Sequence, residues 1–460
     1  MDMQGTGDAR NEPRRALDAV RLARADLTEQ GRWREADEVV LRGIDHLLGL
    51  PEEEAPDPSG LVHIAGGPRP EDTDRRADQP LSPSLGAAVQ AMVFVNRGHG
   101  REAAAERARR ALAEPGAGEL GPFWISNLAL VYCGEAGQAL ESCERTLAVE
   151  GPSNPRLRHA AELLAARAEA AGGPESAHRR FQGLLDEEGH PWRTGLVVAW
   201  TAAALVDRGE ADRAGDLLEG RDLGATFAGQ RDRAELLHAR AGQHLAVGRA
   251  AQAYEDFVEC GRELARVEVV NPAVLPWRSQ AALSAAAIGR RNVALALAQK
   301  ELVDARRWGT PAAVGIALRA AALVSGDVVR QLTEAAELLE RAGVTFELVR
   351  TRCDLGAKLC HDGQRSRGLE VLAAARDHAP AGVWRNRAEE ALRRFAGEES
   401  DLSDQELRVA HLARAGVGNR DIARGLHLVV RTVEFHLSNI YRKLGVSGRT
   451  GLSRTVIPPL

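Results

Sequence analysis

The chain has 460 residues, enough for two to four domains, and 44% of them are hydrophobic while only 4% are aromatic. A core built largely from Ala, Leu and Val favours helix over strand, so we expect an all-α protein. Five scattered cysteines without a CxxC pair do not fit a disulfide framework. The longest apolar stretch, residues 194–206, is too short to cross a membrane, so we expect a cytoplasmic protein with no membrane partner.

The net charge of −5 is unevenly distributed. Residues 401–460 hold nine Arg or Lys and five Asp or Glu, a net charge of +4, whereas the rest of the chain carries −9. A basic tail on an acidic body is typical of a protein whose tail meets a polyanion. Because +4 is modest, chance remains an equally good explanation of the charge alone.

The first 83 residues contain two different kinds of sequence. Residues 1–50 include Gly31 followed by Ala36, which predicts one N-terminal helical repeat. Residues 51–83 contain PEEEAPDPSG and GGPRPEDTDRRADQPLSP, and this Pro-rich, acidic composition is typical of a flexible linker.

One pattern recurs through residues 84–395. A Gly in a polar turn is followed five positions later by a small residue, and from Gly100 onward successive glycines lie 34 to 41 residues apart. Such a Gly ends one helix in a left-handed conformation, and the small residue lets the next helix pack closely on it. The pairs are Gly31/Ala36, Gly100/Ala105, Gly134/Ala139, Gly172/Ala177, Gly209/Ala214, Gly248/Ala253, Gly289/Ala294 and, more loosely, Gly363/Gly368, while Gly326 keeps only the Gly.

Helix pairs of this kind bury their apolar faces only by stacking, which predicts an α-solenoid. The array resembles the tetratricopeptide family, in which the turn Gly and the following Ala have this offset and the period is near 34 residues. The drifting spacing and the missing aromatic positions keep an irregular α-solenoid as the alternative. Residues 396–401, which contain GEES, form a second predicted linker.

Some residues of the array invite a functional interpretation. Trp277 lies in NPAVLPWRSQ and Trp308 in ARRWGTP, and either could line a ligand groove. We favour a Trp packed at a helix joint in both cases. The CHD run at 360–362 could suggest a nucleophile or a metal ligand, but it lacks partners at a known spacing, so we predict no such site.

Residues 402–460 divide into short helices with clear end signals. Ser403 and Glu406 stand in the S-x-x-E relation of a capping box at the start of the first helix. Gly416 is expected to end this helix, and Asn419 is expected to cap the second one, in NRDIARGLHL.

The third helix, in TVEFHLSNIYRKLG, carries one apolar stripe. Its members at helical spacing are Val433, Leu437, Ile440 and Leu444. The opposite side presents Arg431, Glu434, Phe435, Ser438 and Arg442. Gly445 ends the helix, and a weaker fourth helix is expected over residues 448–456. Three short helices, with a tight turn between the second and third, are the helix-turn-helix plan, whose third helix enters the DNA major groove.

This segment resembles the LuxR-type DNA-binding domain. The residues that fit the family pattern are Leu402, Glu406, Gly416, Asn419, Ile422, Ala423, Leu426, Thr432, Val433, His436, Ile440, Lys443, Leu444, Gly445, Val446 and Arg449. RTVEFHLSNIYRKLGV is similar to the version found in large LuxR-family regulators, which have an N-terminal ATPase and a helical repeat arm. NPAVLPWRSQAAL and ARRWGTPAAVGIALRAAAL resemble that arm.

The resemblance implies a DNA-binding site made of Asn419, Arg431, Thr432, Glu434, Phe435, Ser438, Arg442 and Lys443. It implies that Glu434, Phe435 and Ser438 read base edges, and that Asn419, Arg431, Thr432 and Lys443 contact phosphates. Phe435 suits a thymine methyl group, Ser438 suits either base edge, and Glu434 suits cytosine N4. An ion pair with Arg431 or Arg442 is an equal alternative for Glu434, and we expect His436 to be structural.

The segment also departs from the family pattern. Val429 stands where a Ser usually caps the recognition helix, so about 1 kcal/mol of capping free energy is expected to be missing. Gly448 and Gly451 weaken the last helix, which supports dimerisation in the family.

Three functions follow from these patterns. The first is a sequence-specific transcriptional regulator that binds double-stranded DNA, forms a homodimer on it, and receives a small-molecule or protein effector on its repeat arm. The second is a tetratricopeptide-like interaction scaffold whose tail has lost DNA binding. The third, an ATP-driven regulator, does not fit, because none of the three lysines lies in a Gly-Lys-Ser/Thr loop. We expect no enzyme activity, no cofactor and no metal site.

Overall fold

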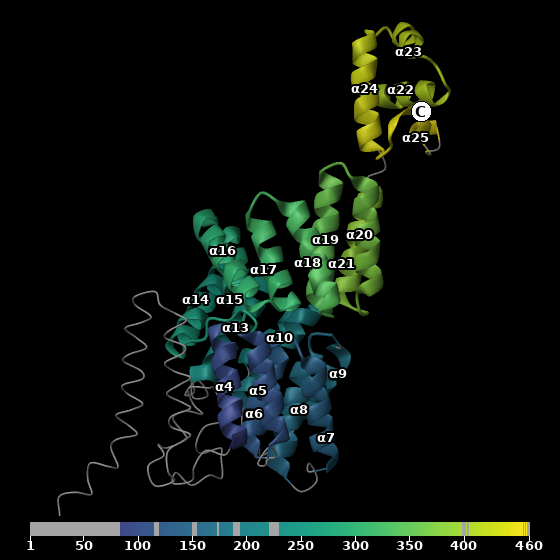
Figure 1. The fold of residues 1–460 in the computed structure, drawn as a ribbon. Helices are drawn as coiled ribbons and strands as arrows, with labels where there is room; N and C mark the ends of the chain where they lie inside the picture. Colours follow the sequence, from purple (N-terminus) through teal and green to yellow (C-terminus); the bar gives the residue numbers. More distant parts are fainter. Residues whose placement is uncertain are drawn as a thin grey trace, which may run out of the picture. The chain divides into compact units, whose positions relative to one another are not determined.

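The computed structural model describes residues 83–114, 119–149, 154–172, 174–186, 194–219, 230–397, 402, 404–453, 455 and 457. Every regular element within these ranges is an α-helix, as the composition predicted (Figure 1). None of these helices is long and apolar enough to cross a membrane. The repeat predicted at 1–50 lies outside the described residues, and so does the predicted linker except for its last residue, which begins α4.

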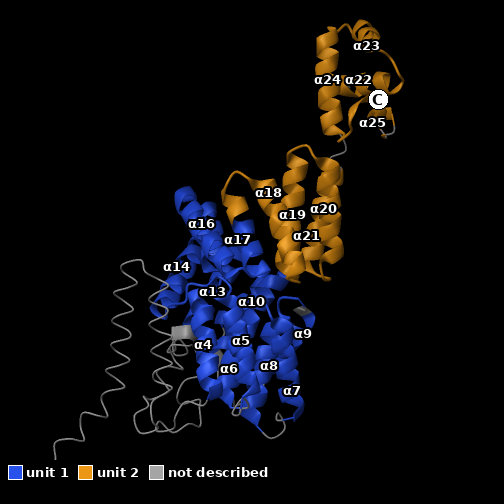
Figure 2. Cartoon of the chain, in the orientation of Figure 1, with its two compact units in different colours: residues 1–320 blue, residues 321–460 orange. Residues whose placement is uncertain are grey.

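The chain divides into two compact units, residues 1–320 and 321–460 (Figure 2). The first unit contains α4 (Pro83–Arg97), α5 (Arg101–Ala113), α6 (Leu120–Tyr132), α7 (Ala136–Val149), α8 (Pro155–Glu169), α9 (Pro174–Asp186), α10 (Thr194–Arg208), α11 (Ala211–Glu219), α13 (Gln230–Ala246), α14 (Ala250–Arg266), α15 (Trp277–Ala287) and α16 (Arg291–Trp308). The boundary falls within α17 (Pro311–Val324). The second unit continues with α18 (Val328–Arg341), α19 (Thr345–His361), α20 (Arg365–His378), α21 (Val383–Gly397), α22 (Asp404–Arg414), α23 (Asn419–Gly425), α24 (Val430–Lys443) and α25 (Gly448–Ser453).

The predicted turn glycines join the helices into pairs. A left-handed conformation is adopted by Gly100, Gly134, Gly209, Gly248, Gly289 and Gly363. The small residue five positions later is buried in each case, and Ala139, Ala214, Ala253 and Ala294 are fully inaccessible to solvent. Gly326, which has no such small partner, does not adopt the left-handed conformation. The array is therefore a tetratricopeptide-like α-solenoid in which these six glycines reverse the chain and the small residue after each of them allows close helix packing.

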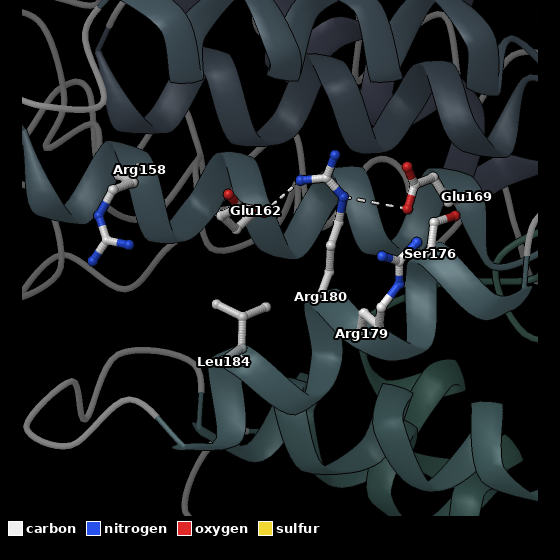
Figure 3. A pocket seen from close by; sticks show the side chains of 8 residues that line it. Arg158, Glu162, Glu169, Ser176, Arg179, Arg180 and Leu184 are labelled. Carbon is white, nitrogen blue, oxygen red and sulfur yellow. Dashed lines mark hydrogen bonds and ion pairs between the residues drawn. The ribbon is translucent and has the colours of Figure 1, made fainter.

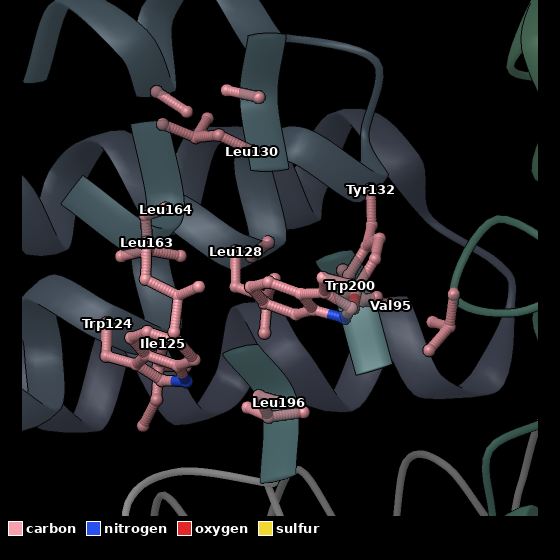
Figure 4. Packing of buried hydrophobic residues seen from close by; sticks show 14 of the residues in the cluster. Val95, Trp124, Ile125, Leu128, Leu130, Tyr132, Leu163, Leu164, Leu196 and Trp200 are labelled. Atoms are coloured by element: carbon pink, nitrogen blue, oxygen red, sulfur yellow. The ribbon is translucent and has the colours of Figure 1, made fainter. Parts of the chain in front are cut away.

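The core of the first unit is built mostly from aliphatic residues with a few aromatic rings between them (Figure 4). Trp124 of α6 and Trp200 of α10 are parallel, with their ring centroids 6.2 Å apart. Leu163 and Leu164 of α8 are completely buried in the same cluster. Helices that are separate along the chain thus share one continuous core, as a stacked array requires.

The last four helices have a core of their own. Val433 and Ile440 of α24 are completely buried and Leu437 is nearly so, while Leu444 packs against them at the edge of the cluster. This confirms the apolar stripe predicted from the sequence. The fourth helix is shorter than expected, because α25 ends at Ser453.

The start of α23 corrects one prediction. Gly418, and not Asn419, occupies the N-cap position, with extended φ and ψ of −66° and 152° and no side-chain cap hydrogen bond. Asn419 is already the first helical residue, so its side chain is available for another contact. The predicted capping box is only partly described, since Ser403 lies outside the described residues.

Candidate nucleic-acid interface

The outward side of α24 is the surface that the sequence predicted to meet DNA. Its exposed side chains are those of Arg431, Glu434, Phe435, Ser438 and Arg442. Phe435 is 65% exposed although it is large and hydrophobic. A ring set between arginine, serine and carboxylate side chains gives a mixed surface, which suits the donors, acceptors and methyl groups of base edges in the major groove.

The N-terminus of α24 is open to an anion. Val429 occupies the N-cap position, and its side chain, 71% exposed, makes no cap hydrogen bond. The first turn contains no acidic residue. Free backbone amides and the positive end of the helix dipole favour a phosphate at this position. Exposed Arg431 and half-buried Thr432 lie in the same turn, where the family resemblance expects phosphate contacts.

The side chain of Asn419 is held by Arg449. Arg449 donates from Nη2 to the Asn419 Oδ1 atom at 2.6 Å and from Nη1 to the carbonyl oxygen of Val417 at 2.7 Å. A longer bond of 3.3 Å runs from Arg449 Nη1 to the carbonyl oxygen of Ala413 in α22. Arg449 therefore fixes the orientation of the Asn419 amide, and its appearance in the family pattern was the available signal.

Lys443 lies in an ion pair within the domain. Its Nζ atom is 2.5 Å from Oε2 of Glu406, whose side chain is only 6% exposed. Because a buried carboxylate needs a positive partner, this pair links α22 to the C-terminal end of α24. The phosphate contact expected of Lys443 stays a prediction, and its side chain is 33% exposed in this geometry.

Two further residues of α24 bear on base reading. No ion pair joins Glu434 to Arg431 or Arg442 among the described residues, so the salt-bridge alternative does not occur in this geometry. His436 is half-buried and its ring lies edge-on to that of Phe435, with centroids 6.2 Å apart. The structural role expected for His436 stays a prediction.

Trp277, Trp308 and the CHD run at 360–362 make packing, hydrogen-bond and ion-pair contacts within the repeat array. Trp308 is 2% exposed and donates from Nε1 to the carbonyl oxygen of Tyr132 at 2.9 Å. Trp277 covers Gly261, where a Cβ atom would come within 2.4 Å of the ring. In the CHD run, His361 lies edge-on to Phe395, and Asp362 pairs with a lysine one turn earlier. Each of these residues thus has a packing, hydrogen-bond or ion-pair partner within the protein.

A charged groove of about 640 Å³ lies between α8 and α9 (Figure 3). At its centre, the Arg180 guanidinium bonds to Glu162 at 2.5 Å and to Glu169 at 3.3 Å, and a third ion pair joins it to Glu144 of α7. Three carboxylates already surround this arginine, so its charge is neutralised within the protein. The network joins three helices and leaves Arg180 poorly suited to an outside anion.

Comparison with known proteins identifies the C-terminal bundle. Residues 400–456 match the family of bacterial regulatory proteins named luxR. These residues form a LuxR-type helix-turn-helix domain. Over 83 residues the chain is 37% identical to the HTH-type transcriptional regulators Mb0914c of Mycobacterium bovis and Rv0890c of Mycobacterium tuberculosis. The aligned region covers 18% of this chain and only 9% of each relative.

The repeat array has more distant structural neighbours. One chain of the APC/C hetero-tetramer Cut9-Hcn1 aligns with 79% of this chain and with 64% of its own length, at 11% identity and a TM-score of 0.44. The signal-transduction ATPase PH0952 of Pyrococcus horikoshii, which has a tetratricopeptide repeat sensor, covers 84% and 72% at a TM-score of 0.35 and 11% identity. Since both TM-scores lie below 0.5, the helix pairs of this chain, and not these neighbours, define its fold.

Proposed function

We propose that this chain is a cytoplasmic, sequence-specific transcriptional regulator that reads double-stranded DNA with α24 of its LuxR-type domain. The observation that carries the proposal is the exposed set on α24, with Phe435 among polar and basic side chains opposite a buried apolar stripe. The open N-terminus of the helix supports the same placement, because it offers amides and Arg431 to a phosphate.

The arm is the receiver of the signal in this proposal, with a small molecule or a protein as effector. The distribution of charge and of buried cores along the chain supports this assignment. The array has the larger core and equal numbers of basic and acidic residues, whereas the net positive charge lies in the tail, which forms a separate bundle. Two copies on DNA would present two recognition helices to two half-sites, as in other helix-turn-helix dimers.

The test is selection of bound sites from random duplex DNA with the full chain. We expect a defined site for the wild-type protein and altered preference at one or two positions for Phe435→Ala and Ser438→Ala. Ser453→Ala, which removes an exposed hydroxyl from α25, is the matched control and should select the wild-type site. Recovery of no common site by the wild-type protein would reject the proposal.

One observation favours the scaffold as a second candidate. Lys443 is engaged by Glu406, so the domain offers one phosphate contact fewer than the family pattern implies. A DNA titration at several salt concentrations separates the two functions. A regulator binds duplex DNA with an affinity that falls steeply with salt, whereas the scaffold shows no measurable binding even at low salt.

A further inference from the structure

The arm contains a contact between segments far apart in the sequence. Residues 267–276 link α14 to α15, and together with the end of α16 they reach the C-terminal ends of α4 and α6. The bonded residues are about 170 to 210 positions apart. In an ordinary solenoid each repeat touches only its neighbours, so this closure is not required by the repeat pattern.

The linking segment bonds directly to the end of α4. The backbone N–H of Val270 donates to the carbonyl oxygen of Asn96 at 2.9 Å, and Asn271 Nδ2 donates to the carbonyl oxygen of Val95 at 2.7 Å. Asn271 is completely enclosed apart from 2% of its surface. The turn after α4 packs so closely that a Cβ atom at Gly98 would lie 3.4 Å from that of Asn271.

The end of α16 supplies the remaining donors. Arg307 donates from Nε to the carbonyl oxygen of Gly98 and from Nη2 to that of Arg97, both at 3.2 Å. Trp308 donates from Nε1 to the carbonyl oxygen of Tyr132, the last residue of α6, at 2.9 Å. We call Glu268, Val270, Asn271, Arg307 and Trp308 together the clasp.

The positions of the acceptors explain why the clasp contributes N–H donors. The last four carbonyl groups of a helix have no intrahelical partner and carry the negative end of the helix dipole. The clasp provides N–H groups for such carbonyls at the ends of α4 and α6, and Arg307 adds a positive charge there. The closure therefore gives N–H partners to the carbonyl groups of Asn96, Arg97 and Tyr132. It adds a second partner to Val95, whose carbonyl oxygen also accepts from the Gly98 N–H.

Glu268 joins the end of α14 to α4. It follows α14 in the left-handed conformation, with φ of 59°, at a position where Gly is the usual residue. A non-Gly residue is strained in this conformation, because its Cβ atom comes too close to the following carbonyl oxygen. The Glu268 side chain forms an ion pair with Arg97 of α4 at 2.5 Å, an interaction that Gly could not make. The residue that adopts the strained backbone conformation is therefore also the one that forms the ion pair with α4.

We propose that the clasp is the conformational switch of the arm. Closed, it fixes α4 and α6 against α14 and α16; opened, it releases these two groups of helices from each other. The proposal gives a role to NPAVLPWRSQ and ARRWGTP, the two motifs that supply most of the clasp. Its regulatory sense rests on the proposed function, because opening would change the arm that controls the LuxR-type domain.

Hydrogen exchange tests the closure without DNA. In the full chain, the Val270 amide should exchange slowly, and Asn271→Ala and Arg307→Ala should each accelerate its exchange tenfold or more. Arg291→Ala removes an exposed arginine from the other end of α16 and should leave exchange unchanged. Glu268→Gly relieves the left-handed strain but should still accelerate exchange. Wild-type rates at Val270 in all three clasp variants would overturn the proposal.

A cross-link keeps the test decisive if an alanine variant does not fold. Gly98→Cys combined with Asn271→Cys places two Cβ atoms about 3.4 Å apart, close to the separation found in disulfides. Mild oxidation should join peptides containing residues 98 and 271, as read by mass spectrometry, whereas Gly98→Cys alone should not join them. Absence of the cross-link in the folded double variant would contradict the closure.

The same double variant tests the switch. With the DNA site recovered by selection, we expect the affinity of the full chain to differ at least fivefold between the cross-linked and reduced forms, and Arg307→Ala to resemble the reduced form. Equal affinities would overturn the switch while leaving DNA reading intact. If the wild-type protein selects no site, the proposed function fails, and exchange and cross-linking still decide whether the clasp exists.

Discussion

Arg449 shows how one side chain can organise the DNA-reading domain. It bonds to the end of α22, to the connection before α23, and to Asn419. Because hydrogen bonds from a charged donor contribute about 1.5–3 kcal/mol, we expect Arg449→Ala to lower the stability of this domain by about 2 kcal/mol and to weaken DNA binding. Hydrogen exchange of the Val433 and Ile440 amides, which lie in the buried stripe of α24, at increasing denaturant measures the first effect. Arg414→Ala, which removes an exposed arginine from α22, is the control. Unchanged stability would show that these contacts contribute little.

Glu301 makes the stability of the arm depend on pH. Burial raises the pKa of this carboxyl group from its ordinary 4.5 to about 7, although Arg278 opposes the shift. Between these two values the folded protein keeps a proton that the unfolded chain releases, so stability falls as pH rises from about 4.5 to 7 and the loss is complete above 7.

The Glu301→Gln variant should lack this dependence. The amide retains an oxygen that can accept from the Ser279 backbone N–H, which bonds to Glu301 Oε1 at 3.2 Å. We expect the Glu301→Gln variant to gain up to about 3 kcal/mol relative to wild type between pH 5 and pH 8, measured by urea unfolding at both values. The exposed carboxyl of Glu337 serves as control, as Glu337→Gln should follow the wild-type pH profile. If the stability of the Glu301→Gln variant changed with pH in parallel with that of the wild type, the expectation would be contradicted.

Among the elements, α24 begins without the residue that its family pattern provides. Val429 is exposed and has the extended backbone of an N-cap residue, with φ and ψ of −84° and 145°. Val429→Ser should therefore raise the stability of the bundle by about 1 kcal/mol, since the hydroxyl can accept from a free amide of the first turn. Thermal unfolding measures this change. The Val429→Ala variant separates the effect of the added hydroxyl group from the effect of removing the valine side chain. Equal melting of the Ser and Ala variants would mean that no cap forms.

The crossing of α19 and α20 depends on the absence of side chains. A Cβ atom at Gly368 would lie 2.4 Å from Cys360 Sγ and 2.8 Å from the carbonyl oxygen of Gly356. Because the second contact is with backbone, Gly368→Ala should destabilise the protein by about 1–3 kcal/mol. Gly183→Ala, in α9 where a Cβ meets nothing within 4 Å, should instead stabilise by about 0.5–1 kcal/mol. Circular dichroism melts compare the two, and a stabilising Gly368→Ala would refute the tight crossing.

How far the sequence predicts these elements depends on the range of the interaction. The Gly and small-residue offset and the apolar stripe of α24 are local patterns, and the structure confirms both. The cap at Asn419 was predicted wrongly, because Gly418 adopts the extended conformation and Arg449 takes the Asn amide. The clasp could not be foreseen, since a repeat pattern carries no information about bonds between residues 170 or more positions apart.

At the scale of the whole molecule, charge separates the two roles of the chain. The body before residue 401 has a net charge of −9 and should repel DNA at long range, while the tail carries +4. Affinity for DNA should then come from the tail, whose exposed arginines release counterions when they meet phosphates. The salt dependence of binding thus measures which residues face the duplex.

We expect Arg431→Ala to reduce the slope of log affinity against log salt by about 1, with a nearly uniform loss of affinity across DNA sequences. Arg431 is exposed in the first turn of α24, beside the open helix end, and among the described residues it has no ion pair that would be lost. Arg393→Ala removes an exposed arginine from α21 in the arm and should leave the slope unchanged. Fluorescence anisotropy titrations between 50 and 200 mM salt, roughly the range over which such contacts dominate, give both slopes. Equal slopes for wild type and Arg431→Ala would mean that another residue makes the phosphate contact. A smaller slope for Arg393→Ala would show that the arm itself touches DNA.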